Sequence, residues 1–511
     1  MVSRITTFSF EGVEARPVDV QVQLSSGQPA FLIVGLPDKA VAESRERIRS
    51  AFAAIGLAFP PKRIVVNLAP ADLPKEGSHY DLPIALALLQ AIGVVPGDAL
   101  HGYAAMGELA LDGALEETVG ALPAAMGAES MGLALVCPSA CGPEAAWSGG
   151  RVVPASSLIG MVNHFSGQNP VCDARPGELI DAPAGPDLRD VKGQEGAKRA
   201  LEIAAAGGHN LLMVGPPGSG KSMLAERLPG LLPPLTAREL LEVSQIQSIS
   251  GHLEQGRLSR SRPFRAPHHS ASMAAMVGGG VKARPGEASL AHHGVLFLDE
   301  LPEFSAQVLD SLRQPLESGQ AVISRANRHV RYPSRFQLIA AANPCKCGGG
   351  QAELACRKKP FCKADYMGRI SGPFMDRIDI FVDVTAVTPA DLSLPAPLEG
   401  SRDVAARIAG ARRLQEARFE NAPAERRRLN VDASAADIDA LFSVENSAQE
   451  LMLQAAEKMG LSARGYYRTL KVARTIADLE GGTAIARHHA AEALTYRQRS
   501  VELPTLQTAR S

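Results

Sequence analysis

The chain lacks a long apolar run. No uncharged hydrophobic stretch approaches the length of a membrane span, and the first residues, MVSRITTFSF, do not contain the apolar core of a secretory signal. These two absences favour a cytoplasmic protein that does not bind membranes. The formal net charge is only −1, which excludes a global basic field, so any nucleic acid must be bound by local patches or by a pore.

Cysteine is also scarce, and its distribution is uneven. The 511 residues include seven cysteines, four of which lie between Cys345 and Cys362. In a cytoplasmic chain, such usage argues against a disulfide framework. Low-complexity repeats are absent as well. Hydrophobic residues make up 45% of the chain and charged residues 21%, which is typical of globular domains.

The chain is long enough for several domains. Short β-like runs that alternate with helical ones predict a compact α/β or α+β domain over 1–147. Glycine, proline and serine cluster over 148–186, which we interpret as a linker with little structure of its own. A nucleotide-binding domain is expected over 187–395, followed by a mostly helical segment over 400–505.

The most informative segment is an octapeptide that follows the apolar run 211–214 and precedes a helical pattern. Its residues are Gly215, Pro216, Pro217, Gly218, Ser219, Gly220, Lys221 and Ser222. A strand, a glycine-rich loop and a helix in this order predict a P-loop, in which backbone N–H groups surround nucleotide phosphates. We expect Lys221 to reach the β- and γ-phosphates of ATP and Ser222 to hold Mg²⁺. A chance glycine-rich turn would not require the flanking strand and helix.

A second apolar run, 294–298, ends in the carboxylates Asp299 and Glu300. This pattern predicts a buried parallel strand whose carboxyl end faces the nucleotide. Asp299 would position Mg²⁺, and Glu300 would polarise the attacking water. Taken alone, the run could be a buried strand capped by solvated acids, but the upstream P-loop favours ATP hydrolysis.

Three further polar residues are candidates for the same site. Asn343 follows a third apolar run, 336–342, where it can align water or sense the γ-phosphate, although Asn-Pro also commonly opens a turn. Arg377 lies between a helical and a strand-like segment, and Arg464 precedes a strongly helical run. An arginine supplied across a subunit boundary can stabilise charge on the phosphoryl group, whereas a lone arginine is more often a surface residue.

The order of these motifs resembles that of AAA+ ATPases, and more narrowly the group that includes magnesium-chelatase motor subunits and replicative MCM helicases. Longer strings are similar to the ComM/YifB family over nearly the whole chain: VGLPDKAVAESRERIRSA (34–51), RPFRAPHHSASMAAMVGGG (262–280) and RTLKVARTIADL (468–479). The resemblance implies an α/β fold with a P-loop AAA+ domain, a parallel sheet and a C-terminal helical lid.

The same resemblance implies residue roles and a function. Asn343 corresponds to sensor 1, Arg377 to an arginine finger acting in trans and Arg464 to sensor 2, while Arg369 is a competing finger. The implied protein is a hexameric, ATP-driven DNA helicase that promotes branch migration in recombination and natural transformation, with single-stranded or branched DNA and recombination proteins as partners. Two alternatives are a motor that remodels a metal-inserting enzyme and an ATP-dependent protease.

The resemblance also draws attention to the segment 262–280. In this group of AAA+ proteins the corresponding insertion projects toward a central pore. The candidate substrate contacts are therefore Arg265, His268, His269 and Lys282. The pairs His268-His269 and His292-His293 could instead hold a metal, but paired histidines more often cap, pack or hydrogen-bond locally.

The clustered cysteines form an insertion over 345–362 within the nucleotide-binding domain. Cys345, Cys347, Cys356 and Cys362 follow the spacing C-x-C-x₈-C-x₅-C. Four thiolates can close a tetrahedral structural zinc site, so Zn²⁺ is a candidate cofactor beside ATP and Mg²⁺. The spacing differs from the usual pairs of CxxC, and free, reduced cysteines are the alternative.

The front domain resembles the S5-like fold of Lon proteases, and the segment 74–85 looks like the one that carries the Lon nucleophile. His79 stands where the serine belongs, and Pro123 stands where the catalytic lysine is expected. A Ser–Lys dyad needs a hydroxyl and an unprotonated amine within hydrogen-bond reach. We therefore predict a Lon-like domain without proteolytic activity, with Ser78 and Lys75 as the remaining pair through which proteolysis could still occur.

Overall fold

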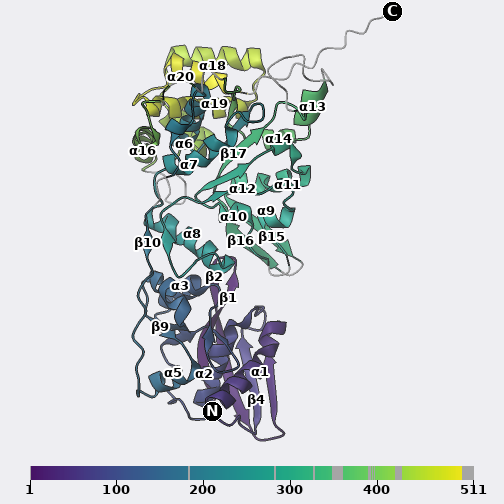
Figure 1. Cartoon of the computed structure of the whole chain (residues 1–511), viewed down its shortest axis with the longest axis vertical. Coiled ribbons are helices and arrows are strands. Elements are labelled where there is room, and N and C mark those ends of the chain that lie inside the picture. The colour runs from purple at the N-terminus through teal and green to yellow at the C-terminus, as the bar shows by residue number, and fades with distance from the viewer. Residues whose placement is uncertain are drawn as a thin grey trace, which may run out of the picture. The chain divides into compact units, whose positions relative to one another are not determined.

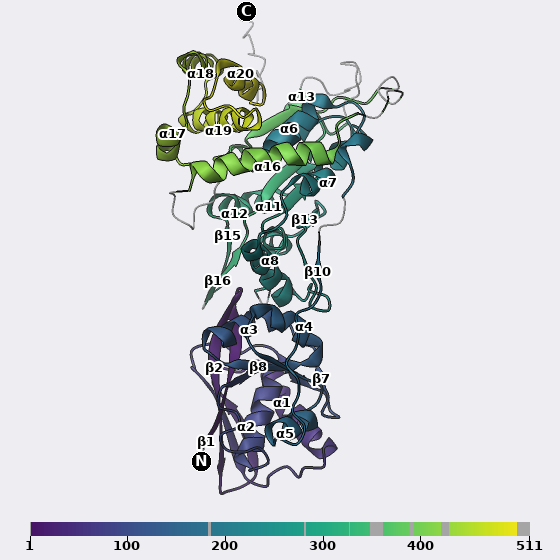
Figure 2. The ribbon, with the colours of Figure 1, turned by 90° about the vertical axis from the view of Figure 1, so that its left-hand side faces the viewer.

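The computed structural model describes most of the chain. The described residues are 2–181, 185–280, 283–325, 328–347, 361–388, 393, 395, 397–420 and 429–497. They form two compact units, whose elements are labelled in the ribbons of Figures 1 and 2. Unit 1 comprises Met1–Asp181, Thr236–Arg260 and Ser324–Tyr332, and unit 2 comprises Ala182–Leu235, Ser261–Ile323 and Pro333–Ser511.

Unit 1 is built on a seven-stranded mixed sheet in the order β3-β4-β2-β1-β5-β8-β9. Its strands are β1 (Val2–Glu11), β2 (Glu14–Ser25), β3 (Ala30–Val34), β4 (Arg63–Ala69), β5 (Tyr103–Ala105), β8 (Ala134–Pro138) and β9 (Val152–Ala155). β2 pairs antiparallel with β1 and β4, and the other neighbours are parallel. On β2, Val18 and Val20 are buried while Asp19 and Gln21 are partly exposed, as the period of two in a strand requires.

Helices pack on both faces of this sheet, because Ala104 and Leu135 lie in one core cluster with α3 while their neighbours Ala105 and Val136 lie in the other with α2. They are α1 (Lys39–Ala54), α2 (Asp81–Ala91), α3 (Ala121–Ser130), α4 (Gly142–Ala145) and α5 (Leu158–Phe165), and a small hairpin joins β6 (Glu108–Leu109) to β7 (Leu115–Glu116). Residues 81–89 of α2 are all buried, which explains why its sequence is apolar all round rather than on one stripe. The sequence predicts a linker with little structure over 148–186, but β9 and α5 lie within that range. They are ordered because Val152 and Leu158 pack into the cores of unit 1.

Unit 1 also contains a segment that directly follows the P-loop helix in sequence. Helix α8 (Ala237–Ser250) packs against α3, and β12 (Leu258–Ser259) pairs in parallel with β10 (Leu179–Ile180). Ser248 Oγ donates to the buried carboxylate of Glu144 at 2.5 Å, which also accepts from the Leu122 N–H at 3.0 Å. Burial raises the pKa of Glu144 despite these two donors. The packing of α8 against α3 therefore depends on the desolvated carboxyl group of Glu144.

Unit 2 contains an all-parallel five-stranded sheet in the order β13-β14-β17-β11-β18. Its strands are β11 (Leu211–Val214), β13 (Phe264–Arg265), β14 (Val295–Leu298), β17 (Gln337–Ala342) and β18 (Ile380–Asp383). All residues of β14 and β17 are buried, as expected for a parallel sheet covered on both faces. The prediction of an α/β fold with a parallel sheet is confirmed.

The helices of unit 2 form two groups. Along the sheet lie α6 (Glu195–Gly207), α7 (Lys221–Leu231), α9 (Met273–Val277), α10 (Glu287–Leu290), α11 (Ala306–Ser311), α12 (Arg313–Ser318), α13 (Phe361–Met367) and α14 (Gly372–Met375). The C-terminal group is α16 (Ser401–Arg418), α17 (Ala435–Leu441), α18 (Asn446–Met459), α19 (Ala463–Leu479) and α20 (Arg487–Thr495). β15 (Gln320–Arg325) and β16 (Arg328–Pro333) form a separate two-stranded sheet before β17, and Ser324–Tyr332 are grouped with unit 1.

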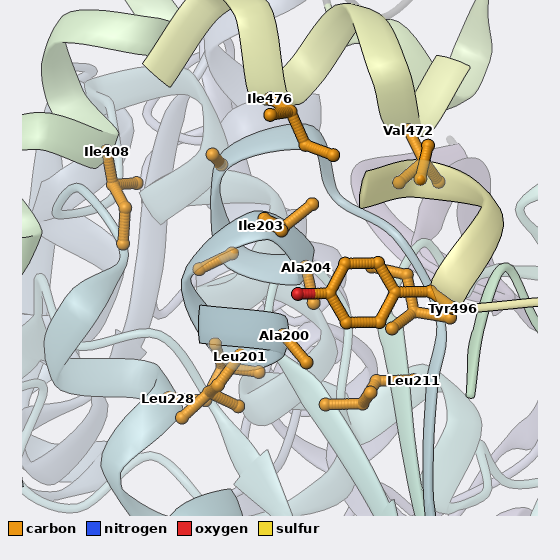
Figure 3. Close-up of a cluster of buried hydrophobic side chains, with 14 of the residues drawn as sticks. Ala200, Leu201, Ile203, Ala204, Leu211, Leu228, Ile408, Val472, Ile476 and Tyr496 are labelled. Atoms are coloured by element: carbon orange, nitrogen blue, oxygen red, sulfur yellow. The ribbon is translucent and has the colours of Figure 1, made fainter. Parts of the chain in front are cut away.

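One hydrophobic core joins the sheet of unit 2 to its C-terminal helices. Side chains of α6, α7 and β11 pack with those of α16, α19 and α20 in a single cluster. Figure 3 shows part of it, in which Ala204, Leu211, Ile476 and Tyr496 come from four different parts of the chain. Figure 2 shows α16 beside α7, and the two helices are in contact. The C-terminal helices are thus packed onto the parallel sheet of unit 2. Within the described ranges, no helix has both the length and the apolar composition needed to cross a bilayer.

Candidate active site

The P-loop of unit 2 is shaped by its glycines. The Gly215 N–H donates to the Ala342 carbonyl at 3.1 Å, and a Cβ at Gly215 would lie 2.1 Å from the Val384 carbonyl oxygen, so no larger residue fits. Gly218 and Gly220 have φ values of 74° and 87°, a region that glycine enters at no steric cost. The loop thus turns sharply between β11 and α7, and the amino end of α7 lies next to the loop, as in a phosphate-binding site.

Lys221, the first residue of α7, is only 7% exposed and bends back over the loop. Its Nζ donates to the carbonyl oxygens of Gly215 and Pro216 at 2.8 and 2.9 Å and lies 3.3 Å from Asn343 Oδ1. Burial lowers the pKa of Lys221, whereas the carboxylates of Asp299 and Glu300 oppose that shift. The ammonium group is therefore held by neutral acceptors, which anionic phosphate oxygens could replace.

The two acidic residues occupy the turn that follows β14. Ser222 Oγ donates to Asp299 Oδ2 at 2.9 Å, so a hydroxyl and a carboxylate converge in the way that a Mg²⁺ site requires. Glu300 has a φ of 52°, unusual for a residue other than glycine. Its N–H donates to Asp299 Oδ1 at 2.8 Å, which orients that carboxylate. The residues of this edge fit a nucleoside triphosphate with its magnesium ion.

The order of the sheet explains why residues far apart in sequence meet here. β17 lies between β14 and β11, and all three strands are parallel. Their carboxyl ends consequently share one edge, which brings Asp299, Asn343 and Lys221 together.

Arg377 lies at the other end of these strands. The carbonyl of Arg377 accepts from Asn210 Nδ2 at 2.9 Å, and Asn210 directly precedes β11. The four residues of β11 separate the two edges by about 13 Å, at about 3.3 Å per residue. The guanidinium of Arg377 is bound to Glu317 and to the Pro373 carbonyl, and its buried Nε has no hydrogen-bond partner among the described residues.

Arg464 lies with Arg377 rather than over the P-loop. Glu317, the partner of Arg377, lines a pocket of about 280 Å³ together with Arg464, Arg468 and Lys471. Burial lowers the pKa of Arg377, and the positive charges of Arg313, Arg464 and Arg468 act in the same direction. The predicted site residues thus form two sets, one at each edge of the sheet.

Sequence comparisons place the chain among known proteins. It is 43% identical over 498 residues to "Uncharacterized protein YifB" of Escherichia coli, with 97% of each chain covered. It is 44% identical over 497 residues to "Competence protein ComM" of Haemophilus influenzae, with 95% of each chain covered. The chain belongs to the ComM/YifB family.

More distant similarity leads to magnesium chelatase. Residues 187–392 match the family model described as magnesium chelatase, subunit ChlI; residues 20–140 match a second ChlI model and residues 398–497 match the C-terminal one. A "Magnesium-chelatase 38 kDa subunit" of Rhodobacter capsulatus is 27% identical over 330 residues, which are 60% of this chain and 87% of that protein. The resemblance to magnesium-chelatase-like proteins is therefore confirmed.

Arg369, the alternative candidate for the arginine finger, has a different environment from Arg377. Its side chain is 45% exposed, lies 3.4 Å from Glu303 and stacks over the ring of Tyr366 at 5.7 Å. Burial and the nearby carboxylate of Glu303 raise the pKa of Tyr366 to about 12. Arg369 is thus tied to the turn that follows Glu300, whereas Arg377 is 8% exposed at the opposite edge.

Sequence reasoning missed two residues of the site. Glu317, on α12, binds Arg377 and lines the pocket beside Arg464, but a single glutamate in a polar helix carries no motif. Gln194 directly precedes α6, with a φ of 61°, and its Nε2 lies 2.5 Å from the Thr385 carbonyl and 3.4 Å from that of Ser219. The adjacent Gly193, also with a positive φ, is the only local signal for this turn beside the P-loop.

The residues expected to contact substrate from the 262–280 insertion have partners within unit 2. Arg265 donates to both carboxylate oxygens of Glu287, at 2.6 and 2.9 Å. His268 is hydrogen-bonded to Ser270 at 2.8 Å, and His269 lies 3.6 Å from Glu300. Lys282 lies outside the described residues. His292 accepts from the Arg335 N–H at 3.0 Å, in keeping with local hydrogen bonding.

Three of the four clustered cysteines come together. The sulfur atoms of Cys345 and Cys347 are 3.0 Å apart, and those of Cys347 and Cys362 are 3.9 Å apart. All three lie within 4.8 Å of one another. Cys356 lies outside the described residues.

The Lon-like residues of unit 1 do not form a dyad. Ser78 Oγ donates to Glu108, whereas the fully buried Lys75 donates to the Pro70 carbonyl. His79 is buried, with Nε2 2.8 Å from the Phe8 carbonyl oxygen, and Pro123 is a buried residue of α3. Hydroxyl and amine are thus engaged by different groups.

Proposed function

We propose that this chain hydrolyses ATP at its P-loop, and that a second copy completes each site with Arg377 and Arg464. The observation that carries this proposal is the separation of the two sets of residues across the sheet. Lys221 and Asp299 occupy the carboxyl edge, and Arg377 occupies the amino edge about 13 Å away. An arginine in that position reaches a nucleotide held by a neighbour more readily than its own.

The electrostatics of the arginine set support an anionic partner. The buried Nε of Arg377 lacks an acceptor among the described residues, and Glu317 opposes the repulsion from Arg313, Arg464 and Arg468. A buried guanidinium that has one carboxylate partner and several nearby cations would be stabilised further by an approaching anion. The triphosphate of a neighbouring copy would supply that charge. A head-to-tail arrangement of this kind can close into a ring, and we propose a ring of six copies.

We further propose that the ring acts on DNA in the cytoplasm as a helicase that promotes branch migration. The name of the Haemophilus relative, "Competence protein ComM", supports this choice, because competence is the uptake of DNA. A net charge of −1 does not oppose it, since a ring can bind phosphates by pore loops alone. Recombination proteins would be its partners.

A second candidate is a motor that remodels a metal-inserting enzyme. It is supported by the similarity to the magnesium-chelatase subunit of Rhodobacter capsulatus. That similarity covers 60% of this chain, whereas the similarity to YifB and ComM covers nearly all of it, so we favour the DNA motor.

The first test is ATP hydrolysis by the purified chain with and without single-stranded DNA, with Lys221→Ala as the control. A DNA motor predicts strong stimulation of wild type and none of the variant. An ATPase that ignores single-stranded and branched DNA would contradict the DNA motor and favour remodelling of a protein partner.

The second test asks whether Arg377 acts across a subunit boundary. Glu300→Gln retains the arginines but loses the water-polarising carboxylate, and Arg377→Ala retains the P-loop and Glu300. Each variant alone is expected to lose about 1000-fold or more in ATP turnover. An equimolar mixture should recover activity at about a quarter of the interfaces, if copies assemble at random.

The matched control is a mixture of Arg377→Ala with the double variant Glu300→Gln/Arg377→Ala, which offers no intact arginine and should stay inactive. If the first mixture is as inactive as this control, Arg377 does not act in trans. The same mixture with Arg369→Ala in place of Arg377→Ala then identifies the competing finger.

A further inference from the structure

The three clustered cysteines, Cys345, Cys347 and Cys362, lie beyond the carboxyl end of β17, the central strand of the candidate active site. Cys345 and Cys347 follow Asn343 by two and four residues, and Cys362 lies in the first turn of α13. Cys362 follows Cys347 by 15 positions in sequence, yet their sulfur atoms are 3.9 Å apart. The fold therefore brings thiols from two segments to one point.

The distances suit a zinc ion. A tetrahedral thiolate site has Zn–S bonds of about 2.3 Å, which place the sulfur atoms about 3.8 Å apart. The 3.9 Å between Cys347 and Cys362 matches this value, and the 3.0 Å between Cys345 and Cys347 needs to open by less than about 1 Å. Rotation about the Cα–Cβ bond of the exposed Cys347 can supply such a change.

The solvent exposure of these cysteines argues against the alternative that they only fill space in the core. Cys345 is buried, but Cys347 is exposed and Cys362 is half-buried. A cysteine that only fills space is normally buried, and an exposed thiol close to two others has no packing role. The same exposure gives an ion access to the cluster from solvent.

We propose that Cys345, Cys347 and Cys362 bind one Zn²⁺ as thiolates, and that this ion fixes the segment after Asn343 to α13. Each thiol gives up one proton on binding, and neither metal nor sulfur changes its oxidation state. Three thiolates leave one position of a tetrahedral ion for a further ligand.

The ion would join the two sides of the candidate active site. On one side, the cysteines continue β17 beyond Asn343, which lies 3.3 Å from Lys221 Nζ. On the other side, α13 carries Tyr366, whose pKa is raised by burial and by the nearby carboxylate of Glu303, three residues after Glu300. Any effect of the ion on ATP turnover rests on the proposed ATPase activity. The binding of zinc itself does not depend on that activity.

The test is the zinc content of the full-length protein, purified under reducing conditions from zinc-supplemented cells and measured by plasma mass spectrometry. Wild type is expected to carry about one equivalent per chain. Cys345→Ser and Cys362→Ser should each lose at least tenfold in zinc content. Cys172→Ser replaces an exposed cysteine of unit 1 and should retain the wild-type content. Metal-free wild type, or full zinc content in Cys362→Ser, would overturn the proposal.

Cobalt provides a second measurement that does not depend on the folding of a variant. Wild type stripped of zinc and titrated with Co²⁺ should develop a sulfur-to-cobalt charge-transfer band, which Zn²⁺ then abolishes by displacement. The absence of that band would contradict thiolate ligation even if zinc were present elsewhere. Because neither measurement uses ATP, a chain that binds zinc but lacks ATPase activity would sink the proposed function and leave the zinc site intact.

Discussion

Each unit of the molecule contains a buried lysine, and only one of the two environments suits a reaction. Lys221 of unit 2 donates to two loop carbonyls and lies beside Asn343, with Asp299 and Glu300 near enough to oppose the lowering of its pKa. Lys75 of unit 1 is fully buried and donates to the Pro70 carbonyl. Burial lowers the pKa of both.

The comparison shows that burial alone does not make a functional lysine. The partners of Lys221 lie on a glycine-rich loop at the carboxyl edge of a parallel sheet, where a phosphate can take their place. Lys75 is not paired with Ser78, because that hydroxyl donates to Glu108. A desolvated amine is useful for catalysis only when a reacting group can reach it.

The largest expected effect tests whether the environment of Lys221 is a phosphate site. Lys221→Ala removes the cation that faces the phosphates, so we expect ATP turnover to fall on the order of 1000-fold, the effect of losing a principal transition-state donor. Steady-state phosphate release measures it. ATP turnover within tenfold of wild type would show that the ring of acceptors around Lys221 is not a phosphate site.

The next effect concerns stability in unit 1. Arg47 Nε donates to the fully buried carboxylate of Asp81 at 2.5 Å, and burial raises the pKa of Asp81. Arg47→Ala leaves that carboxylate without its cation and should cost about 3 kcal/mol of unfolding free energy, measured by urea denaturation. Arg45→Ala, which breaks an exposed pair with Glu46, should cost less than about 0.5 kcal/mol. Equal losses would mean that the charged residues of unit 1 are not a packed structural network.

A smaller effect is expected where α8 docks onto unit 1. Glu144→Ala removes the acceptor of Ser248 Oγ and of the Leu122 N–H. A buried N–H without a partner costs about 2 kcal/mol, which thermal unfolding of the variant would reveal. Glu116→Ala, at an exposed position, is the control and should leave the transition unchanged.

The same residue gives a dependence on pH. Burial raises the pKa of Glu144 above its ordinary value of 4.5, so the folded state binds a proton at pH values where the unfolded state has released it. Stability from this group therefore increases as pH falls toward 4.5 and decreases as pH rises through the folded pKa. Glu144→Gln should flatten the dependence of unfolding free energy on pH in this range. The change in unfolding free energy should be smaller than the loss caused by Glu144→Ala. An unchanged slope between pH 7 and pH 4.5 would refute the assignment.

The smallest effect tests the second half of the comparison. Lys75→Met and Ser78→Ala should each leave ATP turnover within about twofold of wild type, because neither group contacts the nucleotide edge. Neither wild type nor variant should degrade casein. Casein degradation by wild type that is lost in both variants would restore the protease interpretation.

Local patterns predicted the secondary-structure elements at the carboxyl edge of the sheet in unit 2. The strand, loop and helix around Lys221 and the apolar run before Asp299 are short-range features, because chain direction and side-chain periodicity determine them. The parallel order of the strands then requires their carboxyl ends to meet. The α/β fold and the family were therefore predictable from sequence, and both are confirmed.

Other features depended on contacts between distant segments. Nothing local indicates that α8 packs against α3, since that choice depends on the buried Glu144, more than a hundred residues from Ser248. The structure of β9 and α5 was missed because glycine and proline in the region suggested a linker, while Val152 and Leu158 provide the burial that orders it.

The sequence alone determined which chemistry this chain carries: a P-loop with its two carboxylates, two arginines and a set of clustered cysteines. Only the tertiary structure decided where those groups lie relative to one another. Arg377 and Arg464 share a pocket edge with Glu317 at the amino end of the sheet, while Lys221 lies at the carboxyl end. Motifs depend on the local geometry of the backbone, whereas the edge on which a side chain lies depends on strand order and helix packing, which are set by contacts between residues far apart in the chain.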